Sequence, residues 1–522
     1  MNYIGCFSST DAKLISSKRQ RHLIFVGLLA WIIANMSAGN RVYKHLDGSL
    51  TSFPHNIPEN VKEIKIGYSQ IPIIDYIEPF SSLEILNFFQ NNLTRFPDLS
   101  NVSTVLRSLR LASNDIHEVK SIPPIIDLIY LDMSGNSLTD FPDIANLSST
   151  LVELDLSLNH IRKINIHPVM SALEIINLDH NSLVEFPDLE NVSGTLKELS
   201  IVENAFTKID ILVNLPKLSK LIIGGSRFSE FPDLCNLTSS LEELFLKKSM
   251  VDSVSYLPKM LKLKSLKLRK NQLSELPNVA NLSLTLIALD VSYNQIARIS
   301  YVPKMKLLEN VNFNGNLLTE FPDLSNIGTT LRRLEVANNN ISYIPEERAL
   351  SLKMLNYLDL SENPMVLLPS FCHLNNTLEM LLSEGHFTCD WRMVLIKTLD
   401  YFGKIKFSKE SPHCSQPANL AMMNWNEITI KELISEAGTV STASFIKEIH
   451  YRRLENKSWM CPLMVDTILD NVSLIRCGAI CEERPNCLMY SSHQGRCVLA
   501  NHKPSSLEMF YNYDNWYVRI AN

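Results

Sequence analysis

The chain has 522 residues, enough for several average domains or for one long repeat array. With 45% hydrophobic and 20% charged residues it is not a disordered chain, and its 16 glycines are too few for a collagen. The formal net charge of −6 argues against nucleic acid as a partner, since phosphate backbones require a concentrated excess of Lys and Arg.

Residues 1–39 have the layout of a secretory signal peptide. A basic stretch that ends at Arg21 precedes an apolar run from Leu23 to Ala34, and small residues follow up to Gly39. This run is short for a bilayer core, which needs about 20 residues. We therefore expect cleavage after Ala38 or Gly39 and a secreted product without a membrane span. The alternative is an uncleaved signal anchor, which would make a type II membrane protein.

The N-glycosylation pattern N-x-[ST] occurs repeatedly beyond this leader, which supports export. The acceptor asparagines are Asn92, Asn101, Asn146, Asn191, Asn236, Asn281, Asn340, Asn375, Asn456 and Asn471. Those from Asn101 to Asn281 are each 45 residues apart, which points to an internal repeat.

Two asparagine series have the same 45-residue interval and interleave at steps of 22 and 23 residues. One series is Asn114, Asn159, Asn204, Ser249, Asn294 and Asn339, and the other is Asn91, Asn136, Asn181, Ser226, Asn271 and Asn316. The physical unit is therefore 22 or 23 residues long, and the longer period is a pair of units.

Each unit follows the pattern L-x-x-L-x-L-x-x-N-x-[LI], as in the segment from Leu151 to Ile161. The alternation L-x-L predicts a short strand with one buried face, and the Asn side chain can satisfy the backbone groups of the turn that follows. Because no single unit can bury its apolar face, neighbouring units must stack and share one core.

This pattern resembles the leucine-rich repeat family. The resemblance implies an α/β fold, namely a curved solenoid of about 14 repeats over 64–385 with parallel strands on its concave face. The spaced sequons would then lie on the convex or flanking side, in every second repeat, and their glycans would leave the strand surface free.

The ends of such a stack need covers. Residues 40–63 look like a half-repeat cap without the cysteine cluster common in the family, so packing alone would hold it. Residues 386–434 resemble the family's C-terminal cap, which implies a disulfide between Cys389 and Cys414. Trp391 occupies the place where many relatives carry a second cysteine, so we expect a cap with one bridge.

A polar stretch, 435–460, reads as a linker before a cysteine-rich end at 461–522. The spacing C-x3-C-x5-C-x9-C, which begins at Cys477, resembles the PAN/apple family. That resemblance implies a small disulfide-stapled α+β domain with bridges Cys477–Cys497 and Cys481–Cys487. No cysteine follows Cys497, so Cys461 lacks its usual partner and is open to an intermolecular bond.

Two further cysteines lie within the repeats. Cys235 and Cys372 occupy equivalent repeat positions several units apart, too far for a disulfide. We expect both to be buried apolar thiols.

No sequence pattern indicates catalysis. We find no P-loop, H-E-x-x-H, G-x-S-x-G or G-x-G-x-x-G motif, and we expect no cofactor and no metal. His160 and His180 lack a third ligand and read as surface residues. Asp132 and Asp155, in the middle of neighbouring strands, read as part of a solvated row.

The middle x of each L-x-L points away from the core, and this row is polar except at Ile222 and Phe245. Cations and one aromatic residue gather near these two in the sequence. The candidate ligand-binding residues are Ile222, Phe245, Lys247, Lys248, Lys264, Lys267, Arg269, Lys270 and Tyr293. They predict a contact for an anionic or acidic partner. The alternative is that these residues arose by neutral sequence change and that the sheet binds its ligand elsewhere.

The sequence therefore predicts a secreted, non-enzymatic recognition or adhesion protein. An extracellular protein or glycan would bind to the concave face and to the apple-like module. Two alternatives remain open: a structural matrix component that binds copies of itself, and a regulator or inhibitor of an extracellular enzyme.

Overall fold

The computed structural model describes residues 41–209, 212–225, 227–228, 230–254, 256–369, 371, 374, 378–382, 386–389, 393, 396–397, 400, 403–407 and 413–429. For 386, 468–469, 489–493, 496–500 and 516–518 it describes the backbone alone. The chain divides into two compact units, Met1–Met250 and Val251–Asn522.

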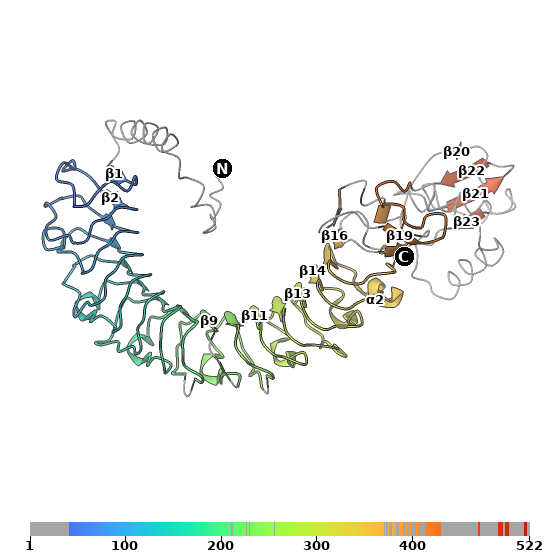
Figure 1. The fold of residues 1–522 in the computed structure, drawn as a ribbon. Coiled ribbons are helices and arrows are strands. Elements are labelled where there is room, and N and C mark those ends of the chain that lie inside the picture. The colour runs from blue at the N-terminus through green and yellow to red at the C-terminus, as the bar shows by residue number, and fades with distance from the viewer. Residues whose placement is uncertain are drawn as a thin grey trace. The chain divides into compact units, whose positions relative to one another are not determined.

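The first unit is a ladder of parallel strands, each hydrogen-bonded to the next in chain order. Its strands are β1 (Val42–His45), β2 (Glu63–Ile66), β3 (Ile85–Asn87), β4 (Ser108–Arg110), β5 (Tyr130–Asp132), β6 (Glu153–Asp155), β7 (Ile175–Asn177), β8 (Glu198–Val202), β9 (Lys220–Gly224) and β10 (Glu243–Lys247). Figure 1 shows these strands on the inner side of the arc that this unit forms.

The core of the first unit is a column of aliphatic side chains in register. Leu109 pairs with Leu131, Leu131 with Leu154, and so on to Leu199, and all of them are buried. Leu109, Leu154 and Leu199 therefore align at every second strand, as the 45-residue period predicts. Each unit alone would leave this column open to water, so burial requires the stack.

After each strand the chain turns through one residue in the left-handed region, directly before the Asn of the repeat. Ser113, Leu158 and His180 have φ of 54–56° in this place, and glycine fills it at Gly135. The Asn that follows then bonds four backbone groups in two turns. Asn159 Nδ2, for example, donates to Met133 O (3.0 Å), Leu156 O (3.0 Å) and Ser157 O (3.2 Å), while its Oδ1 accepts from Leu138 N (3.0 Å).

A second asparagine series bonds the outer turns to one another. In the outer turn of every second repeat, the Asp of the F-P-D motif accepts the backbone N–H two residues later, as Asp143 does from Ala145 (2.9 Å). Asn146, in the 3₁₀-helix η2 (Ala145–Leu147), donates from Nδ2 to Ile122 O of the preceding turn at 3.0 Å. The helices η3 (Glu190–Val192) and η4 (Cys235–Leu237) repeat this arrangement with Asn191 and Asn236.

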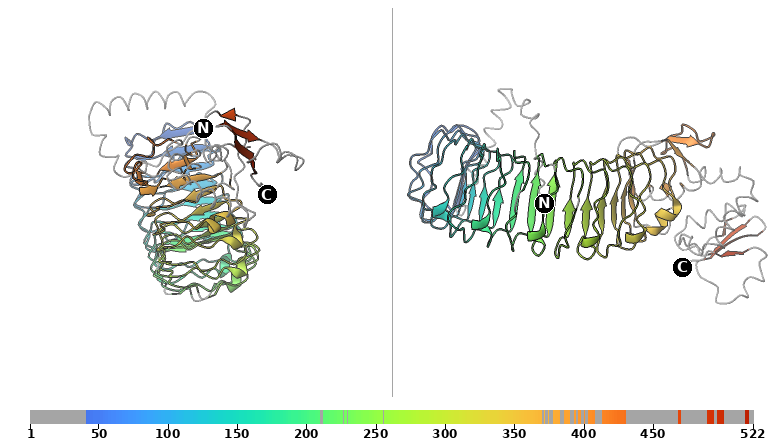
Figure 2. Two further views of the ribbon diagram at one scale, coloured as in Figure 1. Left: turned by 90° about the vertical axis from the view of Figure 1, so that its right-hand side faces the viewer. Right: turned by 90° about the horizontal axis from the view of Figure 1, so that it is seen from below.

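The second unit continues the same construction on its own strands. These are β11 (Ser265–Lys267), β12 (Ala288–Asp290), β13 (Asn310–Asn312), β14 (Arg333–Glu335), β15 (Tyr357–Asp359), β16 (Glu379–Leu382) and β18 (Ile405–Phe407), which pair in parallel in this order. Its outer turns contain η5 (Ala280–Leu282), η6 (Ser325–Ile327) and the helix α2 (Glu346–Ser351). The right-hand view of Figure 2 shows the strands of this unit side by side, seen from below.

Two smaller sheets lie near the C-terminus. β17 (His386–Thr388) pairs in parallel with β19 (His413–Gln416). The four strands β20 (Ile468–Leu469), β21 (Met489–His493), β22 (Arg496–Ala500) and β23 (Trp516–Val518) form an antiparallel sheet in the order β20-β22-β21-β23. None of the helices described in the chain has the length and apolar character needed to cross a bilayer.

The predicted repeats therefore fold as a parallel-sheet solenoid. The 14 repeats expected between Ile64 and Leu360 correspond to the strands β2 to β15. The predicted half-repeat cap also carries a strand, β1, which extends the ladder of the first unit. β16 and β18 add further parallel strands to the second unit, and β18 falls within the predicted C-terminal cap.

One prediction about the repeats is wrong. Cys235 is exposed rather than buried, because it lies in η4 on the outer surface, and its thiol forms no disulfide. Asp233 accepts a hydrogen bond from this thiol and thereby raises its pKa. Cys372 lies outside the described residues.

Candidate functional site

The strand face is the surface formed by the middle side chains of the L-x-L segments. In the first unit these residues pair in register from β1 to β10, so they form one continuous row. In order they are Lys44, Lys65, Asn87, Arg110, Asp132, Asp155, Asn177, Ser200, Ile222 and Phe245. Parallel neighbours are about 4.8 Å apart, so the row is an extended surface rather than a pocket.

The apolar end of this row is a direct cross-strand pair. Ile222 of β9 lies opposite Phe245 of β10, and both side chains are half-buried. β8, β9 and β10 have five residues each, where β3 to β7 have three. The ladder therefore continues past Phe245 to Lys247, which is exposed.

Backbone geometry beside this pair depends on glycine. Gly225 has φ +67°, and a Cβ there would lie 2.4 Å from Glu203 Cδ. A Cβ on Gly224 would lie 1.9 Å from Lys247 O. Glu203 also binds Lys248, whose Nζ is 2.9 Å from Glu203 Oε1. Lys248 therefore contributes less free positive charge to this surface than the sequence suggests.

The remaining candidate residues lie in the second unit, where they form a cation–aromatic group. The Arg269 guanidinium lies 4.7 Å from the centroid of the Tyr293 ring, and Lys270 Nζ lies 5.6 Å from it. Lys267 of β11 lies opposite Asp290 of β12. Lys264, one residue before β11, is exposed. The structure thus brings the candidates together as two groups, one in each unit.

Carboxylates occupy the middle of the row in the first unit. Asp132 lies opposite Asp155, and burial together with that neighbouring charge raises the pKa of the Asp132 carboxyl. Burial and the same carboxylates raise the pKa of Tyr130 to about 12 and also raise that of Glu153. These side chains are half-buried, so the predicted solvated row is less hydrated than the sequence suggested.

An aromatic pair at the start of the row was missed by the sequence analysis. The rings of Tyr68 and Phe89 meet edge to face with centroids 5.0 Å apart, and Lys65 Nζ lies 5.1 Å from the Phe89 centroid. Gly67 makes room for the Phe89 ring, since a Cβ there would lie 2.3 Å from it. The sequence does contain a signal for this pair. Among the residues that lie two positions before each ladder Asn, Phe89 is the only aromatic one.

The predicted glycosylation sites have two kinds of environment. Asn101, Asn146, Asn191, Asn236 and Asn281 lie in outer turns, and each donates its Nδ2 to a carbonyl of the preceding turn at 2.7–3.0 Å. Asn92 and Asn340 directly follow ladder asparagines and are exposed. Asn375, Asn456 and Asn471 lie outside the described residues.

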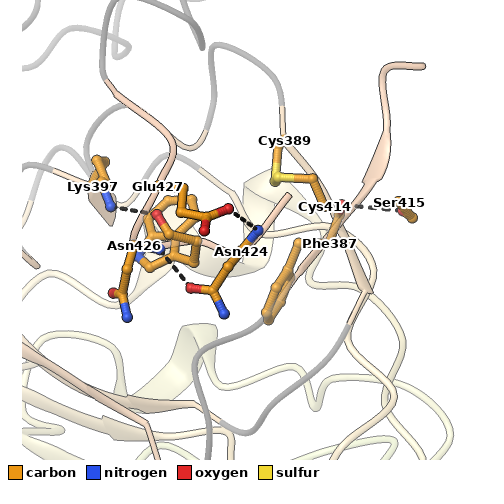
Figure 3. The surroundings of a disulfide bond; sticks show 9 residues. Phe387, Cys389, Lys397, Cys414, Ser415, Asn424, Asn426 and Glu427 are labelled. Carbon is orange, nitrogen blue, oxygen red and sulfur yellow. Dashed lines mark hydrogen bonds between the residues drawn. A yellow bond between two sulfur atoms is a disulfide. The ribbon is translucent and has the colours of Figure 1, made fainter. Parts of the chain in front are cut away.

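The C-terminal cap contains the predicted disulfide. Cys389 and Cys414 are bonded, with their Cα atoms 5.5 Å apart (Figure 3). Beside it, Trp425 is buried and donates from Nε1 to Asp400 Oδ2 at 2.9 Å, while Lys397 Nζ donates to Trp425 O at 2.6 Å. Trp391 and the cysteines at 461, 477, 481 and 487 lie outside the described residues, as does the side chain of Cys497, so their predicted bridges stay predictions.

No group of three or more metal-binding side chains gathers among the residues that the structure describes. The comparisons with known proteins concern the fold. A leucine-rich repeat family model matches residues 147–163. A chain of the Toll–Spatzle complex from Drosophila has a TM-score of 0.50 and 18% identity, covering 73% of this chain and 59% of that chain.

The repeats of this chain have the leucine-rich repeat fold. The glycosylated form of the Toll–Spatzle complex gives a TM-score of 0.51 at 17% identity, over 74% of this chain and 60% of that chain. A leucine-rich repeat protein of Leptospira interrogans is 25% identical over 67% of this chain and 98% of that chain, with a TM-score of 0.47. No curated protein matches the sequence.

Proposed function

We propose that the chain is an exported, non-enzymatic recognition or adhesion protein whose leucine-rich repeats bind a protein ligand through the strand face. The observation that supports this most directly is the half-buried pair of Ile222 and Phe245. It is an apolar contact on a surface that is otherwise polar in the first unit. Aromatic side chains surrounded by polar groups commonly supply most of the energy of protein interfaces.

The polar groups around this pair favour an acidic partner. Lys247 is exposed at the end of β10. In the second unit, Arg269 and Lys270 on Tyr293 supply a further cationic surface of the same kind. A similar fold occurs in the Toll–Spatzle complex, which supports a protein as the class of ligand.

The finer parts of this proposal come from the sequence. They are the cleaved leader, N-glycosylation at the sequons, and a PAN/apple-like module at 461–522 that gives a second contact with protein or carbohydrate. An intermolecular disulfide through Cys461 would favour the self-associating matrix component instead, and non-reducing electrophoresis of secreted protein separates the two cases.

The test of the strand face uses a pair of matched variants of the full chain. F245A removes the aromatic side chain of the pair, whereas Y256A removes an exposed Tyr outside the strand face. Ligands are cross-linked to wild-type protein from an extracellular fraction and identified, and their affinities for both variants are then measured. We expect F245A to weaken binding at least tenfold and Y256A to leave it unchanged. Equal affinities for all three proteins would refute the proposal.

A further inference from the structure

The first unit has a second concentration of positive charge on its strand face, far along the row from Phe245. Lys44 of β1, Lys65 of β2 and Arg110 of β4 have the same register position, with Asn87 of β3 between the last two. Lys44 and Lys65 are half-exposed, and Arg110 is exposed. None of the ion pairs found among the described residues involves these three cations.

Most other lysines of this unit that have a partner bind a carboxylate of a neighbouring repeat. Lys62 binds Glu84, Lys163 binds Glu185, and Lys197 binds Glu174. Several lysines outside the middle row are thus neutralised, whereas Lys44, Lys65 and Arg110 within it have no ion pair in the described part of the chain. A row of cations held at a fixed spacing attracts an anionic ligand and is not explained by packing.

Aromatic rings flank these cations. Lys65 lies over the Phe89 ring at 5.1 Å, Arg110 lies over the Tyr130 ring at 5.1 Å, and Tyr68 is 58% exposed beside Phe89. Stacking on a ring limits the movement of a long cationic side chain, so less entropy is lost when it binds a carboxylate. The cations are thus held ready for a ligand.

Charge along the row changes sign over a short distance. Arg110 pairs in register with Asp132, and Asp132 pairs with Asp155. A uniform polyanion, such as a sulfated polysaccharide or an anionic membrane, would meet these carboxylates as soon as it covered more than β1 to β4. A polypeptide can change charge from residue to residue, so it fits this row better.

We propose that the strand face of the first unit binds an extended segment of its protein partner in which acidic, basic and apolar residues follow one another. The acidic residues bind Lys65 and Arg110, the basic residues bind Asp132 and Asp155, and the apolar residues cover Ile222 and Phe245. This inference rests on the proposed function and adds the chemistry of the ligand.

Strand spacing sets the separation of these groups in the partner. Strands are about 4.8 Å apart, and an extended chain advances about 3.3 Å per residue. The centres of the cationic and acidic pairs are two and a half strands apart, about 12 Å or four residues. The acidic pair and the apolar pair are four strands apart, about 19 Å or six residues.

The test selects ligands from a random library of displayed peptides about 14 residues long, which is enough to span these groups. Full-length wild-type protein is compared with K65E/R110E and with a control, K120E/K163E. Lys120 and Lys163 lie on outer turns, and their replacement changes the net charge by the same amount. We expect wild type to enrich acidic, then basic, then apolar residues at the stated spacing. K65E/R110E should weaken the selected peptides about tenfold and K120E/K163E should not.

Several results would overturn the proposal. They are peptide affinities unchanged in K65E/R110E, an equal loss in K120E/K163E, and no enrichment of acidic residues by wild type. The last such result is tighter binding of heparin or phosphatidylserine vesicles than of any peptide, through Lys65 and Arg110. In that case the ligand of the row would be a polyanion. If K65E/R110E does not fold, as judged by circular dichroism, K65Q/R110Q replaces it with the same expectation.

F245A separates this inference from the proposed function. If F245A still selects acidic and basic residues but no longer apolar ones, both proposals stand. If it selects the same peptides as wild type, apolar residues included, the role of Phe245 is refuted while the charge order holds. If wild type selects no charged residues but F245A still loses the natural ligand, the charge order is refuted while the role of Phe245 holds.

Discussion

Replacing Asn159 by Ala tests how much the asparagine ladder stabilises the repeats. Asn159 is 3% exposed, and its Oδ1 is the acceptor for Leu138 N–H at 3.0 Å. Removing this oxygen leaves the buried Leu138 N–H without an acceptor, which costs about 1–3 kcal/mol. Met133 O and Leu156 O each keep a second amide, from Asn136 and Asn181, and Ser157 O keeps the Gly135 N–H, so each loses only one bond, about 0.5 kcal/mol. The expected loss in the free energy of unfolding is about 3 kcal/mol.

Urea unfolding of N159A, followed by circular dichroism, measures this loss. The control is H160A, because His160 is the next residue and is exposed, so its replacement should change stability by about 0.5 kcal/mol or less. A loss below about 1 kcal/mol in N159A, or equal losses in both variants, would mean that the Asn amide does not hold the turns together.

Three further changes are expected to alter stability. The buried Ser249 hydroxyl occupies a ladder position and has no hydrogen-bond partner. In S249N the new amide can bond Ile223 O and Lys247 O, the carbonyls that ladder asparagines bond elsewhere, so thermal unfolding should show a stability gain of about 1 kcal/mol. D132N should stabilise the protein at neutral pH, because burial raises the pKa of the Asp132 carboxyl and its ionisation opposes folding. This gain should shrink as pH falls from the raised folded-state pKa towards the unfolded-state value of about 3.8 and be absent below it, and a constant gain in urea titrations from pH 3 to 7 would contradict it. C389S/C414S opens a loop of 25 residues and should cost about 3.5 kcal/mol in urea unfolding, whereas C235S, which removes a thiol outside any disulfide, should leave stability unchanged.

The strands of the repeats were predictable because their signal is repeated. Each L-x-L segment gives only three residues of alternation, but the same pattern returns every 22 or 23 residues and fixes both the register and the buried face. The alignment of Leu109 with Leu154 follows from that period. The left-handed residue before each ladder Asn was not predictable, since Ser113, Leu158 and His180 share no property that indicates positive φ. There the fold imposes the conformation on the residue.

The candidate site was predictable only in part. Ile222 and Phe245 were found because the middle row was read on its own, and their direct pairing follows from register. Phe89 was missed because it lies two residues beyond that row. Cys235 was wrongly predicted to be buried. The equivalent residue one period earlier is Glu190, whose charge already indicates an exposed position. The pairing of Lys248 with Glu203 depends on side-chain geometry that periodicity cannot supply.

The bond from Asn146 to Ile122 O, repeated at Asn191 and Asn236, limits how the array can change in length. Each such Asn reaches back to a turn of the other kind, so odd and even turns are not interchangeable. Deleting one 22-residue turn would bring two like turns together and leave one outer carbonyl without its donor. Deleting or duplicating 45 residues keeps every partner in place. Gene rearrangements and engineered versions of this protein should therefore preserve the fold when they add or remove turns two at a time.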